Sequence, residues 1–236
     1  MLDLLGAVIL TAVIALNITA FTAAMPISGA ARLTVSVIAG AWTGLAAFAA
    51  ATGRIADAAA PFPLVGVFVV VPLVAAAVAA IVSPTARRAM LAVPMATLVG
   101  LNIARVFGGF FVLLALVDRL GGPFPQSAGW GDVITGVAAV AVMGLGARET
   151  ASADRTIALW NAFGTLDLVV AILLGVVSSN GSPLQLIHAG AGSAAVQALP
   201  WSLIPTVLVP FYLITHGIVF AKLRARRPVT LHAPAA

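Results

Sequence analysis

Residues 62–83 read FPLVGVFVVVPLVAAAVAAIVS and contain no charged side chain. A helix needs roughly 20 mainly apolar residues to cross the hydrocarbon core of a bilayer, so this stretch is predicted to span a membrane. Six other stretches have the same character, and short segments rich in glycine and proline separate them. The seven predicted spans cover residues 4–25, 33–52, 62–83, 89–117, 131–147, 156–178 and 202–221.

The composition of the whole chain agrees with a membrane protein. Of the 236 residues, 62% are hydrophobic and 8% are charged, whereas soluble domains carry about 25% charged residues. We therefore expect an all-α polytopic membrane protein, in which residues 1–236 form one seven-transmembrane-helix bundle without a soluble domain. The chain has no cysteine, which excludes disulfides, thiolate metal sites and cysteine catalysis.

The basic residues predict the direction in which the chain crosses the membrane, because Lys and Arg concentrate on the cytoplasmic side. With the N-terminus outside, nine of the twelve basic residues fall on the inner side, two fall on the outer side, and Arg105 lies within a span. The N-terminus is thus predicted outside and the C-terminus in the cytoplasm. The inner residues are Arg32, Arg87, Arg88, Arg148, Arg155, Lys222, Arg224, Arg226 and Arg227, and the outer ones are Arg54 and Arg119.

The partner expected from these features is the lipid bilayer. The net charge of +5 does not predict nucleic-acid binding, because the basic residues stand at the ends of segments and form no patch with aromatics. The abundance of arginine, alanine, valine and glycine is typical of a GC-rich bacterial genome, which predicts a location in the bacterial cytoplasmic membrane. Protein subunits and homo-oligomers stay open.

Two connections between the predicted spans have a distinctive composition. Glycines and prolines between 121 and 129 predict a structured loop. The segment 178–200 has no formal charge and alternates apolar with polar residues, which indicates either a short interfacial or re-entrant helix or an ordered loop.

Local similarities suggest a 3+1+3 parallel repeat around the fourth span. Residues 69–72 read VVVP and residues 207–210 read VLVP, and each follows further prolines: Pro61 and Pro63 in one case, Pro200 and Pro205 in the other. Parallel repeats of this kind occur in transporters.

A few ionisable residues lie inside the predicted spans. Arg105, Asp167 and His216 are well inside, and Asp132 begins the fifth span near the outer face. A charge at the centre of a bilayer costs roughly 2.5–3.5 kcal/mol on insertion scales, so such residues pair with one another or face water. Arg105 is placed to reach either Asp132 or Asp167.

Helical spacing groups polar residues on single faces. Asn102, Arg105 and Gly109 share a face of the fourth span, and Trp160, Gly164 and Asp167 share a face of the sixth. The neighbouring glycines leave room for a ligand or for another helix. The residues predicted to bind substrate or couple protons are Asn102, Arg105, Asp132, Trp160, Asn161, Asp167, Tyr212 and His216, and no catalytic residue or metal ligand is predicted.

Each of these residues also has a structural interpretation. Arg105 with Asp132 or Asp167 can be a buried ion pair that fixes helix register, whereas Asp167 can also serve in a proton relay. His216 can be a hydrogen-bonded interior histidine, a proton-transfer group or an axial ligand of haem. Pro205 is expected, with Pro210, to bend the last span and free backbone carbonyls.

These features lead to three functional hypotheses. The first is a small-solute or proton-coupled membrane transporter, not an enzyme, with a polar site for a small-molecule ligand between the fourth, sixth and seventh spans. The second is a membrane-embedded enzyme or redox subunit that binds a lipid, quinone or haem, although the sequence requires no cofactor. The third is a non-catalytic membrane subunit or sensor.

Overall fold

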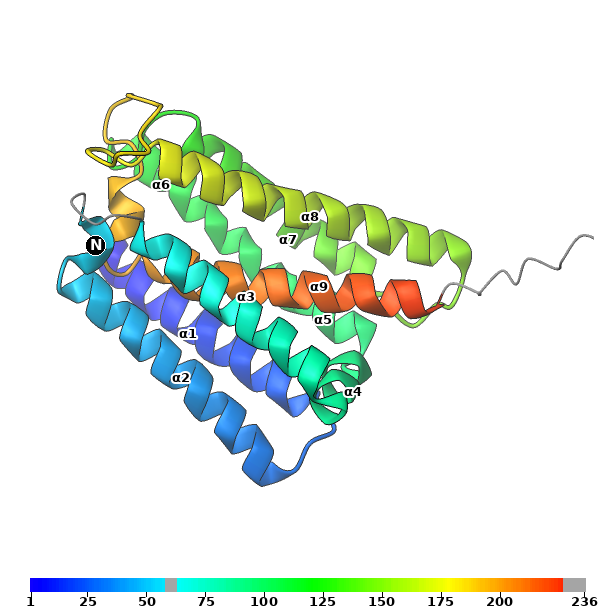
Figure 1. Cartoon of the computed structure of the whole chain (residues 1–236). Helices are drawn as coiled ribbons and strands as arrows, with labels where there is room; N and C mark the ends of the chain where they lie inside the picture. Colours follow the sequence, from blue (N-terminus) through cyan, green and yellow to red (C-terminus); the bar gives the residue numbers. More distant parts are fainter. Residues whose placement is uncertain (58–62, 227–236) are drawn as a thin grey trace, which may run out of the picture.

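The computed structural model of the chain describes residues 1–57 and 63–226. Within these residues the chain forms helices and turns and no strand, and the helices pack into one bundle (Figure 1). Phe62, where the third span was predicted to begin, lies outside the described residues, as do Pro61 of the predicted repeat and Arg227 of the basic inner group.

Six helical stretches are long and apolar enough to cross a membrane, which agrees with a multi-pass membrane protein. The helix α7 (Phe124–Met143), which covers most of the predicted fifth span, is not among them. The six are α1 (Leu2–Ala23), α2 (Gly29–Ala51), α3 (Leu64–Val82), the stretch Met95–Leu116, α8 (Ala151–Val177) and the stretch Ile204–Arg226.

Large apolar side chains cover the outside of the bundle. Contact of such a surface with water costs free energy, whereas lipid chains solvate it. The exposed side chains therefore agree with the membrane assignment. Examples are Leu16, Ile38, Phe48, Ile81, Leu116, Leu166 and Leu173, each more than half exposed.

The predicted fourth span is shorter than residues 89–117. Pro94 interrupts it, because Val93 before the proline is extended and the helix ends there. Residues before the break form a separate helix, α4 (Pro84–Ala92), and Ser83 caps it by accepting a hydrogen bond from the Ala86 N–H at 3.2 Å. The span itself begins with α5 (Met95–Leu101).

The middle of the fourth span is a 3₁₀ helix, η2 (Asn102–Gly108), and α6 (Gly109–Leu116) follows it. A 3₁₀ helix has three residues per turn, so its side chains align every third residue. Asn102, Arg105 and Gly108 therefore form the buried face. The α-helical spacing placed Gly109 on this face, and the tighter turn puts Gly108 there instead.

The fifth predicted span begins earlier than residue 131 and ends earlier than residue 147. Residues 124–129, predicted as loop, are the first turns of α7. The prolines at this end do not break the helix, because the N–H groups of a first turn have no partner within the helix and Pro125 loses nothing there.

The last span begins with a π-helical turn, η4 (Ile204–Leu208), and continues as α9 (Val209–Arg226). In the turn, the Val209 N–H donates to the Ile204 carbonyl, five residues back. Pro210 has no N–H to offer the Thr206 carbonyl, and that carbonyl accepts a hydrogen bond from Trp42 Nε1 at 3.2 Å.

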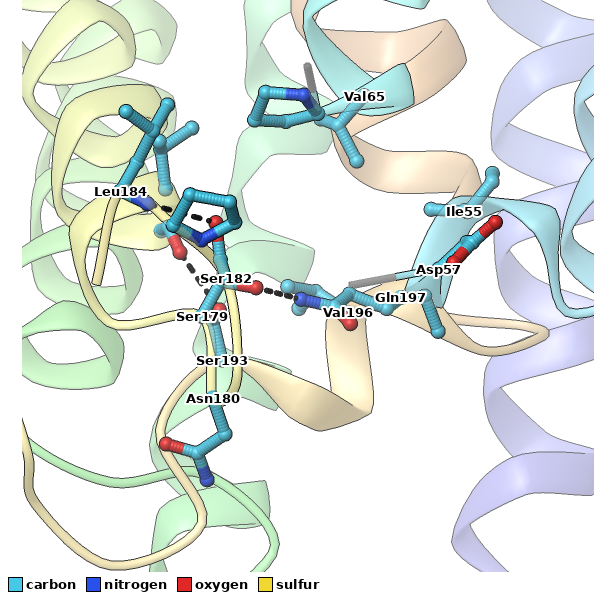
Figure 2. Close-up of a pocket in the computed structure, with 15 residues that line it drawn as sticks. Ile55, Asp57, Val65, Ser179, Asn180, Ser182, Leu184, Ser193, Val196 and Gln197 are labelled. Atoms are coloured by element: carbon cyan, nitrogen blue, oxygen red, sulfur yellow. Dashed lines mark hydrogen bonds between the residues drawn. The ribbon is translucent and has the colours of Figure 1, made fainter. Parts of the chain in front are cut away.

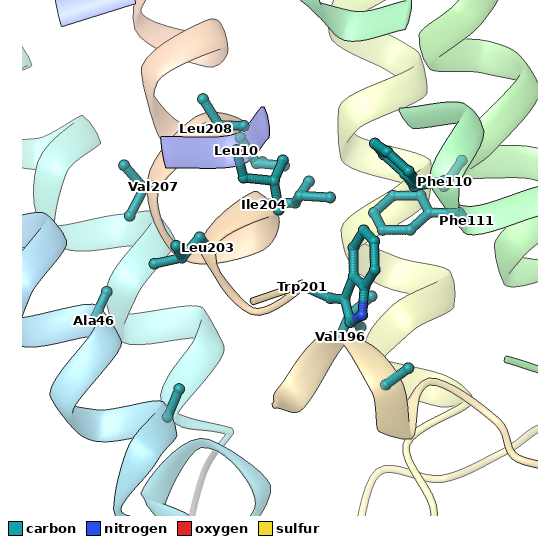
Figure 3. Packing of buried hydrophobic residues seen from close by; sticks show 14 of the residues in the cluster. Leu10, Ala46, Phe110, Phe111, Val196, Trp201, Leu203, Ile204, Val207 and Leu208 are labelled. Atoms are coloured by element: carbon teal, nitrogen blue, oxygen red, sulfur yellow. The ribbon is translucent and has the colours of Figure 1, made fainter. Parts of the chain in front are cut away.

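The helix α9 runs between α3 and α8 and packs against both (Figure 1). The helix α7 packs against η2, α6 and α8. At one end of the bundle, Trp201 is fully buried with its ring 5.1 Å from that of Phe110 (Figure 3). The Asp3 carboxylate accepts from Trp201 Nε1 and pairs with Arg119, each at 2.7 Å.

The opposite end of the bundle is held by other polar contacts. Arg226 pairs with Asp154 at 2.9 Å, and the Lys222 ammonium donates to the Leu91 carbonyl. These contacts join the end of α9 to the start of α8 and to α4.

The segment 178–200 is an ordered loop with one short 3₁₀ helix, η3 (Ala194–Gln197), which favours the ordered-loop alternative. Ser193 anchors it: its N–H donates to the Ser178 carbonyl at 3.0 Å and its hydroxyl donates to the Gly175 carbonyl at 2.7 Å. The Gly121 N–H donates to the Gly192 carbonyl at 2.8 Å, which joins the loop to the start of α7.

Candidate functional site

Arg105 lies at the centre of a buried charge network in the middle of the bundle. The 3₁₀ turn of η2 points it toward α7 and α8, and only 2% of its surface is exposed. Its Nε donates to Asp132 Oδ1 at 2.7 Å, and one terminal nitrogen donates to Asp167 Oδ2 at 2.5 Å. The sequence predicted a pair with one carboxylate or the other, and the structure has both at once.

The remaining guanidinium nitrogen of Arg105 faces α8 and α9. It donates to the Gly164 carbonyl at 3.1 Å and lies 3.1 Å from His216 Nε2. The Arg105 Cζ also lies 5.9 Å from the centre of the Tyr212 ring, within the range of a cation–π contact. Every nitrogen of the guanidinium thus has a protein partner.

Asn161 fixes the ring of His216. Its Nδ2 donates to the His216 carbonyl at 3.1 Å, and its Oδ1 lies 2.7 Å from His216 Nδ1. In this arrangement Nδ1 carries the proton and donates to Asn161, while Nε2 accepts from Arg105. Both ring nitrogens are therefore engaged, and an axial bond from His216 to haem iron would require one of these contacts to break.

Three glycines allow the network to pack closely. A Cβ atom at Gly108 would overlap the Asp132 side chain, and one at Gly131 would overlap the Asp167 carboxylate. A Cβ at Gly164 would lie 2.8 Å from the His216 ring and 3.0 Å from an Arg105 nitrogen. The space that the sequence left for a ligand or a helix is filled by these side chains.

Three further candidate residues take different positions. The Trp160 ring lies 5.4 Å from that of His216, and its Nε1 donates to the Thr135 carbonyl at 3.0 Å. Tyr212 is joined to α1, because Asn17 Nδ2 donates to its hydroxyl at 3.3 Å. Asn102 is buried but stays outside the network: its Nδ2 donates to the Leu98 carbonyl in its own span.

Two small cavities border Asp132. The deep cavity, of about 20 Å³, is lined by Arg105, Asp132 and Tyr212 among others. The middle cavity, of about 50 Å³, is lined by Asp132, Ile172 and Gly175 among others. A water molecule needs about 10–15 Å³ measured in this way, so both cavities have room for water.

The network has an uneven charge. One guanidinium faces two carboxylates, so with His216 neutral the group carries one net negative charge unless it binds a proton or a cation. Among residues 1–57 and 63–226, no three His, Asp or Glu side chains gather to hold a metal ion.

Residues 60–224 match the protein family described as Domain of unknown function (DUF8737). The chain belongs to this family. The search of curated proteins and the search of solved structures each found no match.

The DUF8737 region contains all four ionisable members of the network, Arg105, Asp132, Asp167 and His216. It begins after α1 and α2, so Asn17 is a contact that the chain adds from outside the matched region.

Within the DUF8737 region, the sequence predicted the ionisable residues of the network but not all of the small residues that pack against them. Gly108, Gly131 and Thr135 were not predicted as site residues. The sequence GWGD at 129–132 contained a signal, since a glycine beside an intramembrane aspartate allows a close neighbour. The predicted boundary at residue 131 divided this motif, with Gly129 in the loop and Asp132 at the start of the fifth span.

Proposed function

We propose that the chain is a proton-coupled membrane transporter for a small solute, and that Arg105, Asp132 and Asp167 form its proton-binding centre. The observation that carries this proposal is the pair of buried carboxylates on one guanidinium. A net charge within a bilayer is costly, so the centre gains by binding one proton. Proton binding and release at such a place can drive a conformational change.

The geometry supports a specific coupling. Asp132 is on α7, Asp167 is on α8 and Arg105 is on η2, so the two ion pairs hold three elements together. A proton on one carboxyl weakens that carboxyl's ion pair with Arg105. The helix that carries it is then less firmly tied to η2, and release of the proton restores the contact.

The roles of the other site residues change with this geometry. Arg105 acts as a gating contact and not as an anion site, because each of its nitrogens already has a protein partner. His216 orients the guanidinium, with Asn161 holding its tautomer. Water in the cavities beside Asp132 would deliver a proton to the Asp132 carboxyl and take it away again.

The proposal includes seven crossings, an outside N-terminus and a location in the bacterial cytoplasmic membrane. It is supported by polar contacts at opposite ends of the bundle: Asp3 meets Arg119 before α7, whereas Asp154 after α7 meets Arg226. A path that reaches both ends requires α7 to cross as well. The 3+1+3 repeat stays a prediction. The matched segments differ in that residues 69–72 lie within α3, whereas residues 207–208 lie in the π-helical turn η4 and Pro210 lies in α9.

A pH jump on reconstituted protein tests the proton-binding centre. Proteoliposomes adsorbed on a solid-supported membrane should give a transient current when the outer pH changes, because protons move into the buried centre. Asp132→Asn and Asp167→Asn should each abolish the current. Asp154→Asn, in the ion pair at the end of the bundle, should retain it.

A second candidate function is a non-catalytic membrane subunit in which the network only holds the helices in register. The complete pairing of Arg105 favours it, since buried ion pairs are also found as purely structural features. No current from the wild-type protein would support this function and reject the proton-binding centre. A current that both Asn variants retain would reject the proton-binding centre alone.

A further inference from the structure

A third hollow, the end pocket, opens at the end of the bundle where α8 finishes. It has a volume of about 140 Å³. Figure 2 shows Val65 of α3, the loop after α8 and the Ile55–Asp57 turn arranged around it. Its polar lining consists mainly of hydroxyl and amide groups, from Ser179, Asn180, Ser182, Ser193 and Gln197, together with Asp57.

The end pocket and the two cavities at Asp132 lie in series. Gly175 and Val196 line both the end pocket and the middle cavity. Asp132 and Leu168 line both the middle cavity and the deep cavity, and Arg105 borders the deep one. Neighbouring hollows that share walls form a row from the bundle end to the charge network.

A fourth hollow, of about 350 Å³, lies on the opposite side, where α3, α4 and α9 meet, and none of the residues that line it belongs to the charge network. Leu98, Ile157 and Val219 lie between the network and the other end of the bundle, and each is at most 1% exposed. The two cavities at Asp132 thus share lining residues with the hollow at the end where α8 finishes and share none with this fourth hollow.

We propose that water and protons reach Asp132 from the end pocket, passing between Gly175 and Val196 and through the middle cavity. This route rests on the proposed function. The middle cavity is mainly apolar, with Phe111, Phe124 and Ile172 in its wall and Asp132 at its inner end. Apolar constrictions gate conduction by drying and wetting, so this cavity is the gate of the route.

The loop after α8 sets the width of the gate. Val196 lies in η3, and Ser193 of the same loop bonds the Gly175 carbonyl, so the loop is held against the end of α8. Gly175 forms the opposite wall of the gate and has no side chain to narrow it. A Cβ there would meet the Phe124 ring at 3.4 Å, which is ordinary contact, so a small side chain fits and a large one would fill the passage.

The natural absence of cysteine allows a direct test with single cysteines in the full chain. Ile172 lines the middle cavity, whereas the adjacent Leu173 is 58% exposed on the outside of the bundle. Silver ions, which are close to water in size, would be added to the reconstituted Ile172→Cys and Leu173→Cys variants. The thiols left unreacted would be labelled with a maleimide after denaturation.

Ile172→Cys should react at least about tenfold faster than Leu173→Cys, because a thiol in contact with water ionises and a thiol in lipid does not. Gly175→Leu should slow the reaction of Ile172→Cys by a similar factor, and Gly175→Ala should leave it unchanged. Equal rates for the two cysteines, or no slowing by Gly175→Leu in a protein that still folds, would overturn the route.

The result is separable from that of the proton-binding centre. Fast silver reaction at Ile172→Cys without a pH-jump current supports the route and rejects proton binding at its end. A wild-type current with an inert Ile172→Cys rejects the route, because the protons must then enter elsewhere.

Discussion

Arg105 keeps two buried carboxylates from standing without a partner. Arg105→Gln removes the positive charge and leaves Asp132 and Asp167 facing each other in a low-dielectric interior. Breaking a buried ion pair in this way costs about 3–5 kcal/mol. We expect a loss of that size in the free energy of unfolding, measured by denaturant titration in mild detergent.

The matched control is Arg119→Gln, which removes an ion pair whose side chains are 37% and 52% exposed. Surface pairs contribute at most about 1 kcal/mol. Equal losses for the two variants would mean that the network is well hydrated, contrary to the packing described above.

Gly164 tests the close packing at the same scale. Replacing a glycine inside a helix with alanine usually stabilises by about 0.5–1 kcal/mol. Gly164→Ala should instead destabilise by about 1–3 kcal/mol, because its Cβ meets His216, Thr135 and Arg105. At Gly40 in α2 an added Cβ meets nothing within 4 Å, so Gly40→Ala should show the usual small gain in stability. The two variants would be compared by their thermal unfolding in detergent.

A stabilised Gly164→Ala protein would show that the helices around the network can separate without cost. At Gly40, by contrast, the added methyl group meets no other group within 4 Å.

At the scale of the element, Trp42 compensates for the proline in α9. Its indole donates to the Thr206 carbonyl, which Pro210 cannot satisfy. Trp42→Phe keeps a ring against Phe68 and removes this donor, at a cost of about 0.5–1.5 kcal/mol. The cost should shrink in a Pro210→Ala background, where residue 210 gains an N–H, and a double-mutant cycle of unfolding free energies measures the difference.

Trp130→Phe is the control for this cycle, because the Trp130 indole donates only to the exposed Gln126 of its own helix. It should cost little in both backgrounds. Additive effects of Trp42→Phe and Pro210→Ala would mean that the indole bond is independent of the proline.

The irregular elements show where sequence patterns stop being informative. Asn102, Arg105 and Gly109 fit an α-helical face, but η2 winds more tightly and brings Gly108 under Asp132. Helix type in such a segment is decided by the contacts that its neighbours offer, and Arg105 finds its partners on α7, α8 and α9. No local pattern in residues 102–108 contains that information.

At the scale of the whole molecule, the proposed topology places the two ends of α7 on opposite sides of the membrane. Gln126 lies in the first turn of α7 and Glu149 follows the helix, and both residues are exposed. In the cysteine-free chain, Gln126→Cys should react with an impermeant maleimide from outside intact cells, and Glu149→Cys only after the cells are opened. Labelling of both from one side would reject the seven-crossing topology.

The sequence by itself determined that the chain belongs in a membrane, since long runs without charge have only one favourable solvent. It also singled out Arg105, Asp132, Asp167 and His216, because an ionisable residue in such a run stands out from its surroundings. Only the tertiary structure decided that Arg105 contacts all three of the others at once and that Asn102 stays apart. The physical reason is the distance along the sequence over which each property is set. The preference of a segment for lipid depends on its own residues, whereas the partners of a buried charge depend on how helices distant in sequence pack around it.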